Sequence, residues 1–373
     1  MKIVFFVKSF PKTSETFIIN QVEQLKASVF CQIKGDYEYK NHDKRSIFYF
    51  GDIPFLLKLK RKIYNLLNLY FDPISNRQKK LVEGELLKGK YDIALIQYGS
   101  NAIKFGEACK KAKVPFVIHF HGYDVSALLE IYLYKVFLKK SIRDSKSLVV
   151  VNSFQKRMLI DKFKVNEDKI TIIPCGVNLE IFKRTFDYNN KCVFIMVGRL
   201  TPKKGPLLTL KAFELCAAKI NDIELVIIGD GPLKKELLEN IKSSKFSNKI
   251  TYLGKQNSLE IKGKLNTSDV FLQHSVIAKN GDQEGWPISI AEACAMGLPI
   301  ISTVHSGIQD QVIQGKNGFL VEEYDYKSMG EYMFKLASNI DLRKGMGEDS
   351  RRLIEKNGCL FKQISKLETV LSK

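Results

Sequence analysis

The chain of 373 residues is poor in tryptophan, histidine and proline, which number 1, 5 and 10. It also lacks any apolar run close to the roughly 20 residues that a membrane-spanning helix needs. The first apolar run, Ile3–Val7, is shorter than the hydrophobic part of a secretion signal, and no small-residue cleavage site follows it. We therefore expect a buried first strand and a cytoplasmic protein, either free or attached to the membrane from its inner face.

Several chemical signatures are missing as well. The seven cysteines are odd in number and no two stand in a CxxC spacing, which disfavours a disulfide framework or a zinc site. There is no GxxxxGKS or GxxxxGKT motif, and Gly229-Asp230-Gly231 lacks the third glycine of a dinucleotide fingerprint. We expect reduced, mostly buried thiols, and neither a P-loop nucleotidase nor a nicotinamide-dependent dehydrogenase.

The charge is strongly positive and unevenly distributed. The formal net charge is +19. Lys and Arg outnumber Asp and Glu by 33 to 18 in residues 1–185, but only by 26 to 22 in residues 186–373. An excess of this sign favours nucleic acid, anionic lipid or a phosphorylated substrate as the partner. Charge alone does not choose among the three.

Short apolar runs alternate with longer amphipathic stretches, a pattern typical of α/β proteins with parallel sheets. The predicted strands are Ile3–Val7, Ile93–Gln97, Phe116–Phe120, Leu148–Val151, Ile170–Ile173, Val193–Val197, Leu225–Ile228, Ile250–Leu253, Val270–Leu272 and Ile300–Ser302. The polar stretch Lys183–Lys191 separates two such series. We predict two doubly wound domains, residues 1–185 and 186–373. The charged helical segment from Asp341 onward either completes the second domain or packs back on the first.

One stretch of the first half, residues 54–71, combines apolar residues at helical spacing with four clustered cations. The cations are Lys58, Lys60, Arg61 and Lys62. Such a helix can lie in the interface of an anionic membrane. It can equally be a domain helix with an apolar core face and a solvated basic face. The basic, aromatic stretch 131–143 poses the same question, and the sequence leaves both readings open.

Two carboxylates dominate the run GDQEGWPISIAEACAMGLP at 281–299. Glu284 and Glu292 stand eight positions apart, with Gly285 and Pro287 between them. Proline is tolerated at the start of a helix. We expect Glu284 in a loop and Glu292 about two turns inside the following helix. The N-terminus of such a helix can hold a phosphate, and carboxylates beside it suit sugar hydroxyls.

Two further runs follow predicted strands directly. GRLTPKKG at 198–205 places Arg199 and Lys204 at the carboxyl end of a strand, where doubly wound sheets bind ligands. Cations there suit a diphosphate. The alternative is a solvated loop with two incidental cations, which would show the same sequence. HFHGYD at 119–124 places His121 at a similar edge, where a structural histidine is the alternative.

Together these motifs resemble those of the family 4 retaining glycosyltransferases, over almost the whole chain. The resemblance rests on the segment from Glu284 to Glu292, on GLP at 297–299 and on GRL…KKG at 198–205. FVKSFPKTSETFIINQ at 6–21 and FHGYDVS at 120–126 narrow it to the branch that builds bacterial exopolysaccharides of the colanic-acid type. It implies the GT-B fold, with two Rossmann-like domains facing a cleft, the first binding the acceptor and the second the nucleotide sugar.

The resemblance implies a role for each candidate residue. Arg199 and Lys204 would neutralise the departing diphosphate, and His121 would contact the donor sugar near the reacting carbon. Glu284 would hold donor-sugar hydroxyls, and Glu292 would hold the ribose. The other implied donor contacts are Gly198, Gly285, Trp286, Pro287 and Ile288, with Ser14 and Glu15 on the acceptor side. Ser14-Glu15 replaces the family's usual Gly-Gly pair, and Asp310 stands where many members have Glu, so Asp310 receives no catalytic role.

The resemblance further implies retention at the anomeric carbon without a metal or other cofactor. The donor would be a nucleotide-diphosphate hexose, such as a UDP- or GDP-hexose. The acceptor would be a glycan or an undecaprenyl-linked oligosaccharide in exopolysaccharide, capsule or O-antigen synthesis. We expect a peripheral protein on the inner face of the cytoplasmic membrane, with an anionic membrane surface and no nucleic acid as partner. The alternatives are a nucleotide-sugar epimerase or hydrolase on the same fold, and a non-enzymatic nucleic-acid-binding protein.

Overall fold

The computed structural model describes residues 1–12, 15–36, 46–51, 54–66, 74–188 and 191–373. The chain divides into two compact units. Unit 1 comprises Met1–Pro174 together with Lys362–Lys373, and unit 2 comprises Cys175–Phe361. Ser14, a predicted acceptor-side residue, lies outside the described residues, as do positions 67–71 of the basic stretch.

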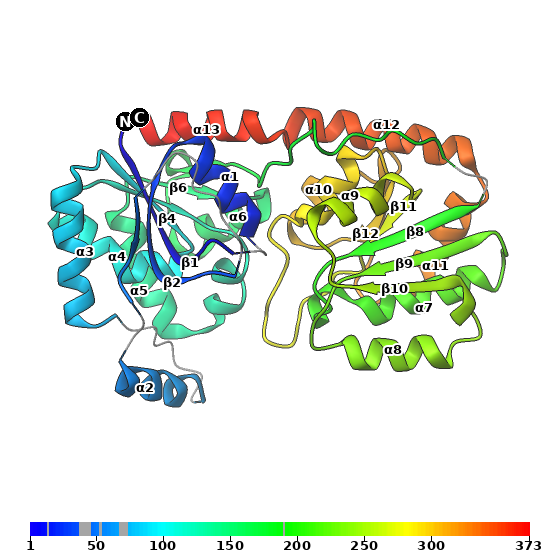
Figure 1. The fold of residues 1–373 in the computed structure, drawn as a ribbon, viewed down its shortest axis with the longest axis horizontal. Helices are drawn as coiled ribbons and strands as arrows, with labels where there is room; N and C mark the ends of the chain where they lie inside the picture. Colours follow the sequence, from blue (N-terminus) through cyan, green and yellow to red (C-terminus); the bar gives the residue numbers. More distant parts are fainter. Residues whose placement is uncertain (13–14, 37–45, 52–53, 67–73, 189–190) are drawn as a thin grey trace. The chain divides into compact units, whose positions relative to one another are not determined.

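The described part of unit 1 is a parallel sheet with helices packed on it (Figure 1). Its strands are β1 (Ile3–Phe10), β2 (Ser28–Lys34), β3 (Ile47–Tyr49), β4 (Ile93–Gln97), β5 (Phe116–His119), β6 (Ser147–Val150) and β7 (Ile170–Ile172). Its helices are α1 (Thr16–Gln24), α2 (Phe55–Leu66), α3 (Asn76–Gly89), α4 (Gly99–Lys111), α5 (Tyr132–Asp144), α6 (Ser153–Phe163) and most of α13 (Leu360–Ser372). The strand order β3-β2-β1-β4-β5-β6-β7 is that of a doubly wound Rossmann-like sheet.

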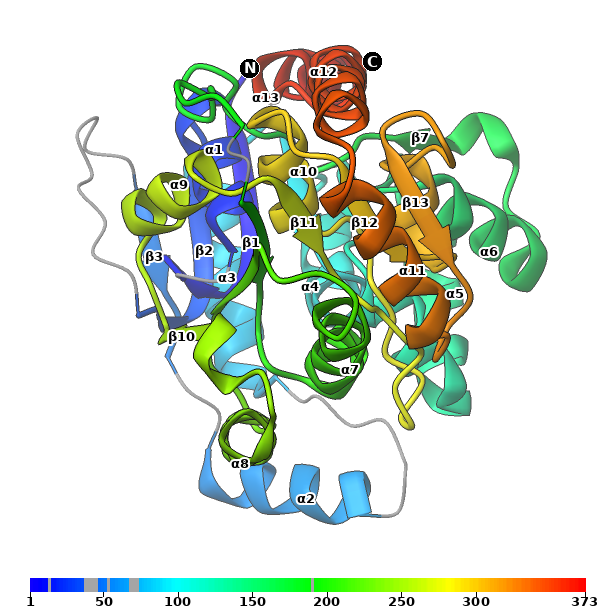
Figure 2. The same cartoon turned by 90° about the vertical axis from the view of Figure 1, so that its right-hand side faces the viewer.

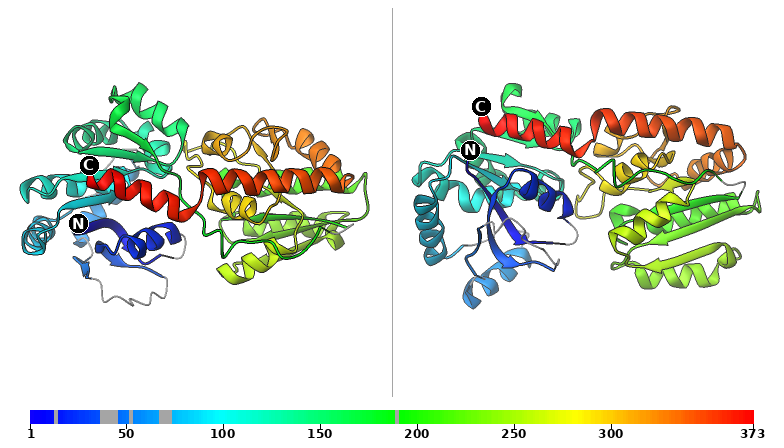
Figure 3. Two further views of the ribbon diagram at one scale, coloured as in Figure 1. Left: turned by 90° about the horizontal axis from the view of Figure 1, so that it is seen from above. Right: turned by 45° about the horizontal axis from the view of Figure 1, so that its top comes forward.

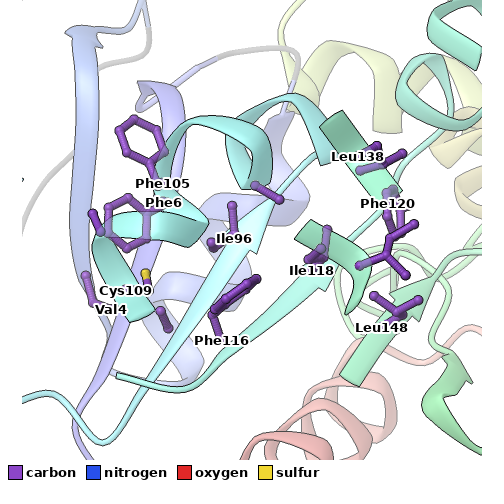
Figure 4. Packing of buried hydrophobic residues seen from close by; sticks show 14 of the residues in the cluster. Val4, Phe6, Ile96, Phe105, Cys109, Phe116, Ile118, Phe120, Leu138 and Leu148 are labelled. Atoms are coloured by element: carbon purple, nitrogen blue, oxygen red, sulfur yellow. The ribbon is translucent and has the colours of Figure 1, made fainter. Parts of the chain in front are cut away.

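One face of this sheet is covered by α3, α4 and α5, which close a large apolar core. Figure 4 shows Phe105 and Cys109 of α4 and Leu138 of α5 beside Phe6 and Ile118 of the strands. All five side chains are buried. Burial on both faces explains why the strands read as continuous apolar runs instead of alternating ones.

Unit 2 repeats the architecture. Its strands are β8 (Cys192–Val197), β9 (Ile223–Ile228), β10 (Ile250–Gly254), β11 (Val270–Leu272), β12 (Ile300–Thr303) and β13 (Gly318–Val321). Its helices are α7 (Pro206–Ala217), α8 (Lys234–Ser243), α9 (Ser258–Asn266), α10 (Ile288–Ala295), α11 (Tyr326–Ala337) and α12 (Ile340–Asn357). The parallel order is β10-β9-β8-β11-β12-β13. Figure 2 shows α7 and α11 on one face of this sheet and α10 and α12 on the other. The prediction of two Rossmann-like α/β domains is confirmed.

The division of the chain at Pro174 lies before the predicted one between residues 185 and 186. The segment after it is held on unit 2 by Arg351 of α12. The Arg351 guanidinium donates to the backbone carbonyls of Leu179 and Phe182 at 3.3 and 2.7 Å. The Val177 N–H also donates to the carbonyl of Gly358. A sequence of loop residues carries no sign of such contacts, which form only once α12 is in place.

The end of the chain returns to unit 1. Residues Lys362–Lys373, which include most of α13, belong to that unit, with Leu367 and Leu371 fully buried. Both views of Figure 3 place the two chain ends, which lie in the same unit, near one another.

Each predicted strand corresponds to an observed one, but β2, β3 and β13 are missing from the prediction. In β2 the polar Gln32 interrupts the apolar run, although its side chain is buried. The strand β3 is short and only partly buried. In β13 a glycine opens the strand because a Cβ on Gly318 would lie 1.9 Å from the carbonyl oxygen of Ile300. Polar and glycine positions of this kind hide a buried strand from a hydrophobicity pattern.

The helix α2 presents its apolar side to solvent. Phe55, Leu56, Leu59 and Ile63 are 78%, 71%, 47% and 47% exposed. At 100° per residue these four side chains share one face of the helix. Figures 1 and 2 show α2 standing apart from the sheet of unit 1. The reading of this stretch as a helix with an apolar core face is therefore wrong for the described residues 54–64. Among the helices described, none is long and apolar enough to cross a bilayer.

Candidate active site in the second unit

The strand order of unit 2 reverses at β8, which has β9 on one side and β11 on the other. Ligands of doubly wound sheets bind at the carboxyl ends of the strands at such a switch point. The loop after β8 contains Gly198, Arg199 and Lys204, and the loop after β11 runs from Gln273 to the start of α10. The topology thus brings together the runs 198–205 and 281–299.

A tight turn sets the position of Lys204. Residues Pro202–Lys204 form one turn of 3-10 helix, and Gly205 follows with a φ of 54°. A Cβ at Gly205 would lie 1.9 Å from the carbonyl oxygen of His274, just after β11. Only glycine combines this left-handed conformation with so close an approach. The loop after β8 is therefore packed directly against the end of β11.

Lys204 forms a buried ion pair with Glu284. The Lys204 Nζ lies 3.2 Å from Glu284 Oε1, and both residues are less than a tenth exposed. The same ammonium donates to Gln273 Oε1 at 3.2 Å. The Gln273 amide nitrogen donates to Ser275 Oγ at 2.8 Å, which turns its oxygen toward the lysine. Of the three N–H donors of the ammonium, the described contacts give one to Gln273, while Glu284 is its charge partner.

The charges of the pair stabilise one another. Burial alone would raise the pKa of the Glu284 carboxyl, but the cations Lys204 and Lys203 outweigh it and lower that pKa below its ordinary value. Burial lowers the pKa of the Lys204 ammonium, against the opposing effect of Glu284. The site therefore holds a carboxylate and an ammonium side by side out of contact with bulk water.

Arg199 and Lys203 add positive charge to the same loop. The Arg199 side chain is exposed, and within the described ranges no hydrogen-bond or ion-pair partner is found for it. Its charge acts on Lys204 and helps to lower the pKa of that ammonium. Lys203, to which no motif assigns a role, is buried and lies 3.0 Å from Asp282 Oδ1. It ties the loop after β8 to the loop that carries Glu284.

Glu292 lies within α10, as expected, and the helix begins at Ile288 with Pro287 as its N-cap. No side chain caps the first turn of this helix. The Glu292 carboxyl is largely enclosed by protein, and burial raises its pKa to about 8. The buried indole N–H of Trp286 has no acceptor in the described part of the chain. A carboxyl and an indole donor that find no partner among the described residues are groups that a polar ligand could engage.

His121 belongs to unit 1 and lies in the loop after β5. Its Nε2 donates to Gln97 Oε1 at 2.6 Å, and the Gln97 amide nitrogen donates to Gln21 Oε1 at 2.8 Å. The buried Nδ1 has no partner among the described residues. Burial, followed by the neighbouring His119, holds the pKa of His121 well below its usual range. The imidazole is therefore neutral, with Nδ1 as an acceptor.

Two other residues of unit 1 complete this region. Asp124, from the HFHGYD run, accepts the backbone N–H of His121 and, through its other oxygen, that of Gly99 at the start of α4. It thereby ties the loop after β5 to the loop after β4. Glu15, predicted on the acceptor side, pairs with Lys12 at 3.0 Å after β1. Gln97 and Asp124 were not assigned a role from sequence, because polar groups buried at strand ends carry no motif of their own.

Family models match most of the chain. The model described as "Glycosyltransferase Family 4" matches residues 30–181, and that described as "Glycosyl transferases group 1" matches residues 177–353. The second match contains the Arg199–Glu292 region described above. The chain belongs to the family 4 glycosyltransferases. This membership favours the enzymatic prediction over the nucleic-acid-binding alternative.

Curated relatives and solved structures agree with that membership. This glycosyltransferase is 26% identical over 363 residues to the putative colanic acid biosynthesis glycosyltransferase WcaL of Salmonella typhimurium, covering 88% of this chain and 89% of that protein. It is 28% identical over 368 residues to the UDP-Gal:alpha-D-GlcNAc-diphosphoundecaprenol alpha-1,3-galactosyltransferase of Escherichia coli, covering 93% and 88%. Its fold is similar to that of Anabaena HepE in complex with UDP, with a TM-score of 0.81, 17% identity and full coverage of both chains. The predicted GT-B fold is confirmed.

Proposed function

We propose that this glycosyltransferase transfers a hexose from a nucleotide-diphosphate sugar with retention of anomeric configuration, in bacterial surface polysaccharide synthesis. The observation that carries the proposal is the buried Lys204–Glu284 pair at the switch point of unit 2, with Arg199 exposed beside it. Glycosyl transfer passes through an oxocarbenium-like transition state. A diphosphate that departs in such a step needs its growing negative charge stabilised.

Fixed cations supply that stabilisation. Besides the N–H that Gln273 accepts, the Lys204 ammonium has further donors for phosphate oxygens, and the Arg199 guanidinium has no partner among the described residues. The uncapped first turn of α10 adds backbone N–H donors. Each such preorganised group is worth roughly 3 kcal/mol in a transition state. We therefore propose that transfer needs no metal ion.

The carboxylates would recognise hydroxyl groups. Glu284, held as an anion by Lys204, is suited to accept hydrogen bonds from donor-sugar hydroxyls. Glu292, in α10, is suited to the ribose hydroxyls, because bound hydroxyl donors would stabilise its otherwise costly anion. We also propose a part in the same reaction for His121, whose neutral imidazole is held by Gln97. The relatives' names favour a UDP-hexose, since one names UDP-Gal as donor and one structure holds UDP.

The acceptor we propose is a glycan or an undecaprenyl-linked oligosaccharide, used at the inner face of the cytoplasmic membrane. The described element that supports a membrane location is α2. Lys60 and Lys62 are exposed and flank its solvent-facing apolar side. An apolar face bordered by lysines matches the chemistry of an anionic lipid interface. The relative whose name contains an undecaprenol-linked acceptor supports the choice of acceptor.

Thermal stabilisation by nucleotide sugars tests the donor proposal. A bound donor raises the melting temperature by mass action, so a panel of UDP- and GDP-hexoses should include one that stabilises the protein. Incubation of that labelled donor with and without lipid-linked glycan then identifies the reaction. Transfer that depends on acceptor supports the proposal. Free hexose or an epimerised donor, formed equally without acceptor, would establish a hydrolase or an epimerase instead.

A further inference from the structure

The loop that carries Glu284 makes an excursion between β11 and α10. Residues 278–282 form a tight turn, in which the Ala278 N–H donates to the carbonyl of Asp282 at 3.1 Å. On one side, Lys203 binds the loop through Asp282 and through its own carbonyl, which accepts the Val276 N–H. A loop of this length must be held both before and after the turn if the Glu284 side chain is to keep one position.

The second anchor comes from His305 and Glu323, which follow β12 and β13. The Ile277 N–H donates to Glu323 Oε2 at 2.8 Å, and the Glu284 N–H donates to His305 Nε2 at 3.0 Å. His305 Nδ1 lies 2.6 Å from Glu323 Oε1. The Glu323–His305 pair therefore holds the loop at two points, the backbone N–H of Ile277 before the tight turn and that of Glu284 after it.

The chemistry of these contacts defines the state of the imidazole. A backbone N–H can only donate, so His305 Nε2 accepts through its lone pair and Nδ1 carries the proton. Nδ1 then donates to the Glu323 carboxylate. The His305 side chain is 1% exposed, so water cannot replace a lost partner. Loss of either residue leaves a buried backbone or side-chain group unpaired.

We propose that His305 and Glu323 are positioning residues. By holding the backbone of Glu284, they would place its carboxylate where it binds the donor sugar. This inference rests on the proposed function for its meaning in catalysis, but the positioning itself is a property of the protein without ligand. Binding of the nucleoside diphosphate should depend on Arg199 and Lys204, which follow β8. Recognition of the sugar should depend on the His305–Glu323 pair. The two contributions can therefore be separated by experiment.

The experiment compares His305→Leu, which removes both hydrogen-bonding nitrogens, with His305→Gln, whose side chain can still accept and donate. Glu323→Leu is the second disruptive variant. Glu322→Leu is its matched control, because Glu322 is the exposed neighbour. Amide hydrogen exchange of the peptide 276–286 is measured without ligand, with the β8 and β9 peptides as the reference for global folding. UDP affinity and the kcat and KM for donor are measured in parallel.

We expect exchange of peptide 276–286 to rise about tenfold or more in His305→Leu and Glu323→Leu, and to stay near wild type in His305→Gln and Glu322→Leu. Donor kcat/KM should fall roughly 10- to 100-fold in the disruptive variants, while UDP affinity changes less than about threefold.

Unchanged exchange in both disruptive variants would overturn the inference. So would an equal loss of UDP affinity, or faster exchange throughout unit 2, because either would show a merely structural role. If His305→Leu does not fold, Glu323→Leu decides. A wild-type protein that binds no UDP would count against the proposed donor instead, and the exchange measurement would still decide the role of the pair.

Discussion

Lys204 Nζ lies 3.2 Å from Glu284 Oε1, and neither side chain has appreciable access to solvent. The pair joins the loop after β8 to the loop before α10, at the switch point of the second sheet. A buried pair of this kind adds little net stability, because desolvation offsets most of the attraction. Its worth lies in holding a carboxylate and an ammonium ready for a sugar and a diphosphate.

The first prediction concerns the two charges separately and together. Lys204→Met should destabilise the fold by roughly 3 kcal/mol, because it leaves the Glu284 carboxylate buried without its cation. The double variant Lys204→Met/Glu284→Gln should recover most of the lost folding stability. It should still lack transferase activity, because both charged groups are gone. Denaturant unfolding of the single and double variants measures the coupling. Additive losses in the double variant would contradict a direct interaction.

The second prediction concerns Arg199. Since its exposed guanidinium has no partner among the residues described, Arg199→Ala should change stability by less than about 0.5 kcal/mol. Turnover should nevertheless fall roughly 100-fold or more if the guanidinium stabilises the departing diphosphate. Thermal melts and steady-state kinetics are the measurements, with the exposed Lys235→Ala as the charge-matched control in the same unit. Turnover near wild type would remove Arg199 from the mechanism.

The third prediction concerns His121. Burial holds its pKa well below the usual range, so the imidazole is neutral throughout the range from about pH 6 to pH 8. His121→Ala should therefore lower turnover by a similar factor, on the order of 100-fold, at every pH in that range. The pH–rate profiles of wild type and variant should be parallel. A variant that loses an acid limb present in the wild type would show that His121 titrates during catalysis.

The fourth prediction concerns Glu292, whose pKa burial raises to about 8. The folded protein keeps this proton near neutrality, whereas the unfolded chain releases it. Because the unfolded state then binds fewer protons, stability should fall as pH rises from about 5 to about 8. Glu292→Gln should remove that slope and stabilise the protein at pH 8 by roughly 4 kcal/mol, at about 1.4 kcal/mol per pKa unit. Melting temperatures across this range test it, with exposed Glu236→Gln as control; parallel wild-type and variant curves would contradict it.

The fifth prediction concerns the lysines beside the apolar face of α2. Lys60→Gln with Lys62→Gln should weaken binding to anionic vesicles by about 30-fold, since each lysine near such a surface contributes about 1 kcal/mol. Sedimentation with vesicles containing acidic lipid is the measurement. Lys242→Gln with Lys245→Gln removes the same charge from exposed positions of unit 2 and serves as control. Equal binding of both double variants would mean that α2 has no special part in membrane attachment.

The sequence by itself determined the fold class and most of the candidate site. Buried parallel strands are apolar throughout, so runs such as Ile93–Gln97 and Val270–Leu272 predicted strands with the observed bounds. The spacing from Glu284 to Glu292 placed one carboxylate in a loop and the other in a helix, as found. These features are local, and neighbouring residues suffice to specify them.

Only the tertiary structure decided which distant groups meet. The partners of Lys204 are Gln273 and Glu284, and the partner of His305 is Glu323, contacts that exist because parallel strands end at a common edge. The sequence likewise did not determine which side of α2 faces solvent. An apolar stripe has the same sequence pattern whether it packs on a core or is exposed to water, as in α2. Burial, and with it the raised pKa of Glu292, depends on the whole fold and is invisible in any short stretch of sequence.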